Sequence, residues 1–169
     1  HGTEGEDDPE GYHVPPGSVP ARDVEALLDL ARRERPGLIG FSFTSNFYGL
    51  AELLTRRLRS AVDCPIIWGG VDATANPDMA ILHADMVCVG EGEGATLDLV
   101  ERLELGRDCS DIPNLWVRQG DEIKKNCVRP LVQDLDSLPF CDFDLEGKYW
   151  ISGGEARHGV VPTGSHLET

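Results

Sequence analysis

Three short apolar segments alternate with amphipathic segments along the chain, and this order constrains the fold more than any other feature. The apolar segments cover residues 38–43, 64–68 and 85–89. They lack the polar alternation of a strand with one solvated face, which is typical of strands buried on both faces of a parallel sheet. We therefore predict an α/β fold: a flavodoxin-like or Rossmann-like parallel sheet with right-handed crossovers and helices on both faces.

Four helices are predicted around these strands. The first begins after Pro20 and ends before Pro36, where proline cannot continue a helix. The others cover residues 48–61, residues 77–82 and a segment that ends at residue 103. The two N-terminal helices each carry one apolar face, formed in the first by Val24, Leu27, Leu28 and Ala31 and in the second by Leu50, Leu53, Leu54 and Leu58.

The regular alternation ends after residue 108, which suggests a division of the chain into four parts. Segments 114–119 and 122–128 flank Gly120-Asp121 and are expected to form a small β-hairpin, followed by an extended C-terminal arm. We expect a flexible acidic arm over residues 1–20, the α/β domain over 21–108, the hairpin and connecting arm over 109–145, and a linker or tail over 146–169.

The charge balance excludes several classes of partner. The chain has 30 acidic and 15 basic side chains, a formal net charge of −15, so its field repels nucleic acid and anionic membranes. No segment approaches the roughly 20 apolar residues of a membrane span. The five cysteines are scattered without a Cys-x-x-Cys pair, which argues against a disulfide framework or a metal site. We expect a cytoplasmic protein.

Small and polar residues follow each predicted strand. Ser42, Thr44 and Ser45 follow the first, Gly69-Gly70 follows the second, and the alternating glycines and glutamates of residues 90–94 follow the third. The carboxyl ends of parallel strands meet at one edge of a sheet, where such folds bind ligands. Hydroxyl groups and bare backbone at one edge suit a large flat ligand with a polar tail.

The order of these blocks resembles the cobalamin-binding domain that precedes the barrel of cobalamin-dependent radical S-adenosylmethionine (SAM) enzymes. The matching blocks are Gly37-Leu38-Ile39-Gly40-Phe41-Ser42, Pro65-Ile66-Ile67-Trp68-Gly69-Gly70-Val71, Ala84-Asp85-Met86-Val87-Cys88-Val89-Gly90-Glu91-Gly92-Glu93 and Asp134-Leu135-Asp136-Ser137-Leu138-Pro139-Phe140. The resemblance implies cobalamin as cofactor. It assigns the corrin and its nucleotide tail to Ser42, Thr44, Ser45, Gly69, Gly70, Val71, Gly90, Glu91 and Gly92.

Three departures from the family pattern narrow this expectation. No histidine stands in the Asp-x-His-x-x-Gly motif that coordinates cobalt from below, so no protein ligand to the metal is predicted. The acidic arm stands where the family has about two further β-α units. The cysteine triplet for a 4Fe-4S cluster is also missing. The resemblance thus implies an incomplete cobalamin-binding module without a catalytic motif, whose cluster, SAM and barrel belong to a downstream domain in cis. The parent enzyme would be of the methyltransferase or cyclase type.

The sequence is also compatible with other functions. Gly90-x-Gly92-x-x-Ala95 satisfies the dinucleotide fingerprint of a Rossmann domain, although glutamates in that loop would repel a pyrophosphate. A cofactor-free docking or regulatory module is the second alternative, because an incomplete pocket need not hold a corrin. A catalytic carboxylate pair among Asp72, Asp85, Glu91 and Glu93 is disfavoured, since no nucleophile, metal site or histidine base lies near them in the sequence.

Overall fold

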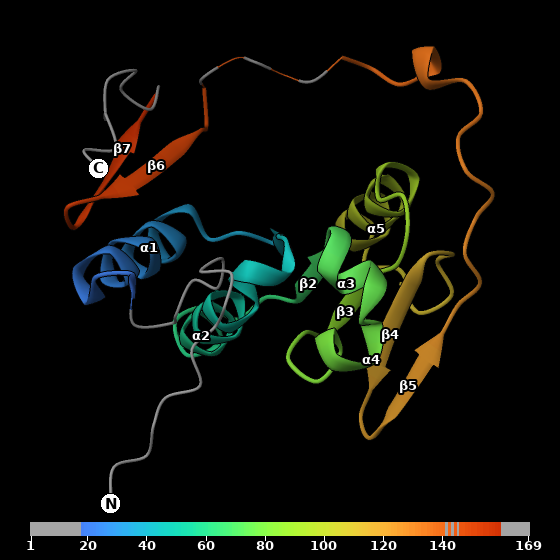
Figure 1. Ribbon diagram of the computed structural model, residues 1–169, viewed down its shortest axis with the longest axis horizontal. Helices are drawn as coiled ribbons and strands as arrows, with labels where there is room; N and C mark the ends of the chain where they lie inside the picture. Colours follow the sequence, from blue (N-terminus) through green and yellow to red (C-terminus); the bar gives the residue numbers. More distant parts are fainter. Residues whose placement is uncertain (1–17, 141, 143, 145, 160–169) are drawn as a thin grey trace, which may run out of the picture.

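The computed structural model describes residues 18–140, 142, 144 and 146–159, and within them one mixed sheet forms the centre of the molecule (Figure 1). Its strands run in the order β1-β2-β3-β4-β5. The bounds are Ile39–Ser42 (β1), Ile66–Gly69 (β2), Met86–Cys88 (β3), Leu115–Gln119 (β4) and Glu122–Lys125 (β5). Strands β1, β2 and β3 are parallel, and β4 and β5 are antiparallel additions. The predicted α/β fold is confirmed, with β1 at one edge.

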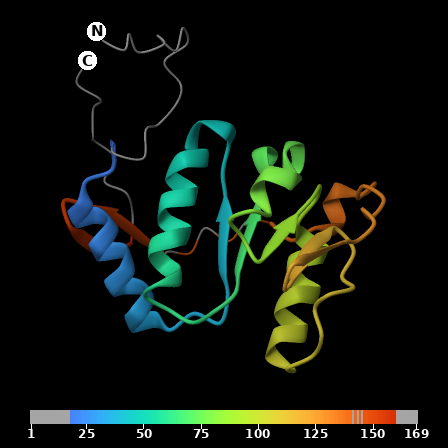
Figure 2. The same ribbon diagram turned by 90° about the horizontal axis from the view of Figure 1, so that it is seen from below.

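Helices cover both faces of the sheet, as the alternation predicts. The helices are α1 (Ala21–Glu34), α2 (Tyr48–Arg59), α3 (Val71–Ala75), α4 (Pro77–Ala80) and α5 (Glu93–Glu104). Trp68 and Val87 point to the face packed by α1 and α2, whereas Ile67 and Cys88 point to the face packed by α5. This split follows from the two-residue period of a strand. Figure 2 shows α2 and α5 on opposite sides of the parallel strands.

Trp68 is the centre of the core on the α1 and α2 face. Its side chain is fully buried, and its Nε1–H donates a 2.9 Å hydrogen bond to the hydroxyl of Thr55. The Phe43 and Tyr48 rings meet the indole edge-on, with centroid distances of 5.0 and 5.6 Å. His83 stacks on the indole at 5.5 Å. Edge-to-face and stacked aromatic pairs stabilise a core beyond their buried area, so this cluster fixes β2 against α2.

The predicted hairpin is present as β4 and β5, and it extends the main sheet. Gly120 occupies the turn with a φ of 63°, a conformation that glycine adopts without steric cost. Strand β4 pairs antiparallel with β3, with Cys88 opposite Leu115. The division expected between residues 108 and 109 lies in the loop between α5 and β4, and the strands on both sides of it belong to one sheet.

A second hairpin lies where the sequence predicts a linker or tail. Strands β6 (Tyr149–Ser152) and β7 (Glu155–His158) pair around Gly153-Gly154, whose φ angles of 66° and 86° are typical of two-residue hairpin turns. The hairpin packs beside α1, where the Tyr149 hydroxyl donates to the Glu34 carboxylate at 3.1 Å. The sequence predicts no strands within residues 149–158, where a glycine pair that is compatible with flexibility forms a tight turn.

The extended arm between the two hairpins is confirmed. Over residues 126–140 it runs from β5 along the outside of the molecule, with one short 3-10 turn at Leu135–Ser137 (Figure 1). The predicted acidic arm over residues 1–20 lies mostly outside the described residues, as does the tail from residue 160. None of the helices in the described part of the chain is long and apolar enough to cross a membrane.

Candidate functional site

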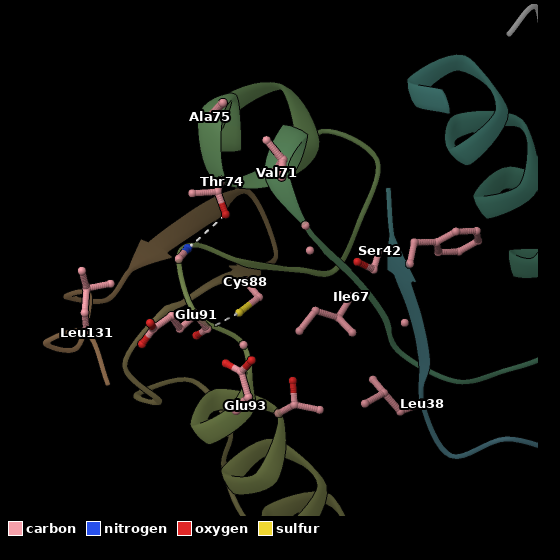
Figure 3. A pocket seen from close by; sticks show the side chains of 17 residues that line it. Leu38, Ser42, Ile67, Val71, Thr74, Ala75, Cys88, Glu91, Glu93 and Leu131 are labelled. Atoms are coloured by element: carbon pink, nitrogen blue, oxygen red, sulfur yellow. Dashed lines mark hydrogen bonds between the residues drawn. The ribbon is translucent and has the colours of Figure 1, made fainter. Parts of the chain in front are cut away.

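A cavity of about 1030 Å³ opens at the carboxyl ends of the parallel strands and continues along the α5 face of the sheet. Its floor consists of alternate residues of three neighbouring strands: Gly40, Ser42, Ile67, Gly69 and Cys88. Helix α3 forms one side and the first turn of α5 forms the opposite side (Figure 3). A cavity of this size at this edge of an α/β sheet is the usual position of a ligand site.

Seven of the nine residues that the family resemblance implies line this cavity. They are Ser42, Gly69, Gly70, Val71, Gly90, Glu91 and Gly92. Thr44 instead lines a smaller cavity of about 390 Å³ between β1 and α2. Ser45 lines neither, because it begins the short 3-10 turn Ser45–Phe47 and bonds to Asp72. The structure thus brings the residues after all three strands together, and it places two hydroxyl-bearing residues of the first loop elsewhere.

Two kinds of glycine build the cavity. A Cβ atom on Gly70 would lie 2.8 Å from the Phe43 carbonyl oxygen, and Gly70 and Gly90 have φ angles of 93° and 88°. At these two positions the backbone conformation itself requires glycine. By contrast, a Cβ on Gly40, Gly69 or Gly92 would come no closer than 3.7 Å to any neighbour. A Cβ would therefore make only ordinary contacts at these three positions, and the absence of side chains there widens the cavity.

Hydrogen bonds tie the loops of the cavity to one another. The Ser45 hydroxyl donates to Oδ1 of Asp72 at 2.6 Å, which joins the loop after β1 to α3. The backbone N–H of Gly90 donates to the Thr74 hydroxyl at 3.1 Å, which joins the loop after β3 to α3 (Figure 3). Bonds between side chains and loop backbone hold a site in one geometry before a ligand arrives.

Asn114 holds the loop after β3 in place through side-chain hydrogen bonds. It is 1% exposed and has a φ of 70°, which asparagine tolerates better than most residues. Its Nδ2 donates to the Val89 carbonyl at 2.8 Å, and its Oδ1 accepts from the backbone N–H of Arg129 at 3.0 Å. One buried side chain therefore connects the end of β3 with the start of the connecting arm.

The cavity presents both acidic and soft groups to a ligand. Glu91 and Glu93 stand at its mouth, and Cys88 lies on its floor. Burial, reinforced by the nearby Glu93 carboxylate, raises the pKa of the Cys88 thiol. The thiol is therefore neutral at pH 7 and behaves as a small apolar group.

Several cavity residues are absent from the sequence-based set. Gly40 and Ile67 belong to strands and Leu38 directly precedes β1, and the two-residue period places all three on the face of Ser42 and Gly69. That period is visible in the sequence and could have found them. Leu131 comes from the connecting arm, and no sequence signal places it against the cavity. Thr74, Ala75 and Thr96 follow from α3 and α5, and the sequence predicts α3 only as a loop.

Comparison with known proteins identifies the family. A family model described as the B12 binding domain matches residues 10–100, more than half of the chain. The chain belongs to the B12-binding domain family. The match includes β1, β2, β3 and most of the cavity, and it ends before β4 and the connecting arm.

Two relatives with similar sequences are much longer than this chain. An uncharacterized methyltransferase of Pyrococcus horikoshii, PH0819, is 31% identical over 103 residues, which cover 58% of this chain and 22% of that protein. An uncharacterized protein of Methanocaldococcus jannaschii, MJ1620, is 29% identical over 110 residues, which cover 64% of this chain and 21% of that protein. The chain therefore spans about a fifth of the length of either relative.

Two solved structures share the fold at low sequence identity. TsrM from Kitasatospora setae, a radical SAM methyltransferase with cobalamin and a 4Fe-4S cluster bound, superposes with a TM-score of 0.54 at 21% identity. The match covers 63% of this chain and 21% of TsrM. OxsB, a cobalamin-dependent SAM radical enzyme with aqua-cobalamin and SAM bound, gives 0.56 at 18% identity, covering 64% of this chain and 16% of OxsB. The domain resembles the B12-binding domains of such enzymes.

Proposed function

We propose that this chain holds cobalamin in the cavity at the carboxyl ends of β1, β2 and β3. One observation carries the proposal: a large cavity in a chain of the B12-binding family has three glycines, Gly40, Gly69 and Gly92, in its lining, where no steric clash or backbone conformation requires glycine. A corrin is a large, flat ring with amide side chains, and it requires a wide surface free of side chains. The donor and acceptor groups around that surface are few, as in most cofactor sites.

The polar groups of the cavity fit the periphery of a corrin. The hydroxyls of Ser42 and Thr96 can bond to its amide groups or to the nucleotide tail, and Glu93 can accept hydrogen bonds from amide N–H groups. Gly70 and Val71 bring backbone close to the ligand at the start of α3. Apolar Ile67 and the neutral Cys88 thiol would pack against the ligand and exclude water.

The parent protein, we further propose, is a cobalamin-dependent radical SAM enzyme. Its barrel would lie in cis and would hold the 4Fe-4S cluster and SAM. The fold shared with TsrM and OxsB supports this, as does the relative described as a methyltransferase. When bound, cobalamin would supply methyl transfer or radical cyclisation chemistry, whereas the residues described above would hold and orient it. A cytoplasmic location is part of the same proposal and rests on the four described cysteines, which are all free.

The proposal is tested by adding hydroxocobalamin in excess to the purified chain, removing unbound cofactor by gel filtration and recording the absorption spectrum. We expect a corrin band that elutes with the protein at about one cofactor per chain. A protein fraction without that band contradicts the proposal and favours the cofactor-free docking module. A parallel titration with NAD tests the dinucleotide alternative, for which we expect no binding, because Glu91 and Glu93 stand where a pyrophosphate would lie.

A further inference from the structure

The start of the connecting arm, residues 129–132, lies against the rim of the cavity and is held there by three separate contacts. The backbone N–H of Arg129 donates to Oδ1 of the buried Asn114 at 3.0 Å. The Arg129 guanidinium forms an ion pair with Asp98 on α5. The backbone N–H of Val132 donates to Oε2 of Glu91 at 2.8 Å. Leu131, between these attachments, lines the cavity although 64% of its surface is exposed.

We propose that residues 129–132 form a side wall of the cofactor site, that Leu131 is its contact with the bound molecule, and that Glu91 is a positioning residue that holds the wall in place. The inference rests on the proposed function, and it reassigns Glu91 from a direct ligand of the corrin to a support for Leu131. It also extends the site beyond the part of the chain that the family model matches, which ends at residue 100.

The position of Glu91 supports this role. Glu91 is next to Gly90, whose backbone N–H bonds to Thr74 on α3, so the loop that carries the carboxylate is fixed at its base. Residues 126–134 contain no helix or strand, and the arm therefore has few backbone contacts of its own. A hydrogen bond to a charged acceptor is stronger than one between neutral groups. Loss of the Glu91 carboxylate should thus release Val132 while Asn114 and Asp98 still hold Arg129.

The position of Leu131 explains why a large exposed apolar side chain lies at the cavity. In Figure 3, Cys88 and Ile67 lie between Leu131 on one side of the view and Leu38 on the other. Covering an exposed leucine with a ligand removes apolar surface from water, which favours binding. A ligand that fills the cavity and reaches its mouth would bury Leu131. Such a ligand would pack between the sheet and the arm.

The test compares hydroxocobalamin affinity among variants of the full chain by absorption titration. Glu91→Ala and Leu131→Ala remove the two groups in question. Glu101→Ala, on the exposed face of α5, and Leu135→Ala, which is 66% exposed on the same arm away from the cavity, are the matched controls. Glu91→Gln keeps an oxygen that can accept from Val132. Hydrogen exchange of residues 128–134, measured without ligand, reports directly on the hydrogen bond to Val132.

Glu91→Ala and Leu131→Ala should each weaken binding about tenfold, the effect of one lost contact of this kind. Glu91→Gln should retain most of the affinity, and the double variant should bind about as well as Glu91→Ala, since Glu91 acts through Leu131. Exchange over residues 128–134 should accelerate in Glu91→Ala and stay unchanged in Leu135→Ala. If the wild type binds hydroxocobalamin and Glu91→Ala and Leu131→Ala each bind it as tightly as the wild type does, the side wall is disproved while the proposed function stands. If the wild type binds none, the proposed function fails first, and the wall inference falls with it.

Discussion

The hydroxyl of Ser45 donates a 2.6 Å hydrogen bond to Oδ1 of Asp72, which is 3% exposed. The bond connects the loop after β1 with the first turn of α3, the helix that forms one side of the cavity. The other carboxylate oxygen of Asp72, Oδ2, is buried and has no hydrogen-bond partner among the described residues. Asp72 therefore contributes to the shape of the site through Ser45 and Asn76, and it does not line the cavity.

Replacing Asp72 should destabilise the chain. Asp72→Ala removes the acceptor of the hydrogen bonds from the Ser45 hydroxyl and the Asn76 amide, and we expect the free energy of unfolding to fall by about 1–3 kcal/mol, the net contribution of two such bonds. Asp72→Asn keeps an acceptor for Ser45 and should lose less. Urea denaturation followed by tryptophan fluorescence measures both. The exposed Glu104→Ala serves as control, and an Asp72→Ala variant as stable as that control contradicts the structural role.

Filling the floor of the cavity should block cobalamin without harming the fold. A Cβ on Gly40 would meet only Ile67, at 3.7 Å, so Gly40→Leu extends its side chain into the cavity without a clash at its base. We expect hydroxocobalamin affinity to fall at least about tenfold, because a leucine side chain occupies part of the volume that the ligand needs. Thermal unfolding should stay close to that of the wild type.

The matched control for this variant is Gly37→Leu. Gly37 precedes β1 by two residues, lies outside the cavity and has nothing within 4 Å of a built Cβ. It should bind like the wild type. Equal affinity of the Gly40 and Gly37 variants would show that the ligand lies elsewhere.

Asn114 should be among the least replaceable polar residues. Asn114→Ala removes the bonds to Val89 and Arg129 and forces alanine to a φ of 70°, so we expect a loss of about 2–4 kcal/mol in the free energy of unfolding. Asn114→Gly accepts that φ and loses only the bonds, so it should be about 1 kcal/mol more stable than Asn114→Ala. Urea denaturation distinguishes the two. A reversed order would contradict the role of backbone conformation.

The sequence predicts the fold well where local patterns and long-range packing agree. The three apolar segments are the parallel strands β1, β2 and β3, and the helical faces of α1 and α2 supply buried residues such as Leu28 and Leu58. The hairpin at Gly153-Gly154 was missed because a glycine pair has the same composition in a linker and in a tight turn. Only its packing on α1 distinguishes the two.

The site was predictable to the extent that it consists of loops at the ends of strands. Gly69, Gly70, Gly90 and Gly92 follow directly from strand order. Leu131 and Asn114 were not predictable, since they approach the cavity from a segment more than 20 residues beyond β3, and their contacts depend on tertiary structure. Ser45 was assigned to the ligand by resemblance, but its hydroxyl points to Asp72.

The thiol of Cys88 offers a chemical readout of the cavity. Burial raises its pKa, so the fraction of reactive thiolate at pH 8 is smaller than for an unperturbed cysteine. Iodoacetamide at pH 8 should therefore modify the exposed Cys127 well before Cys88, and the rate at Cys88 should keep rising between pH 8 and pH 10. Peptide mass spectrometry follows each site.

Hydroxocobalamin should slow the modification of Cys88 further, because the ligand would cover the cavity floor. Cys109, whose pKa burial also raises but which lies outside the cavity, is the internal control and should react at the same rate with and without cobalamin. Equal protection of Cys88 and Cys109 would indicate a general stabilisation of the fold, and protection of neither would place the ligand away from Cys88.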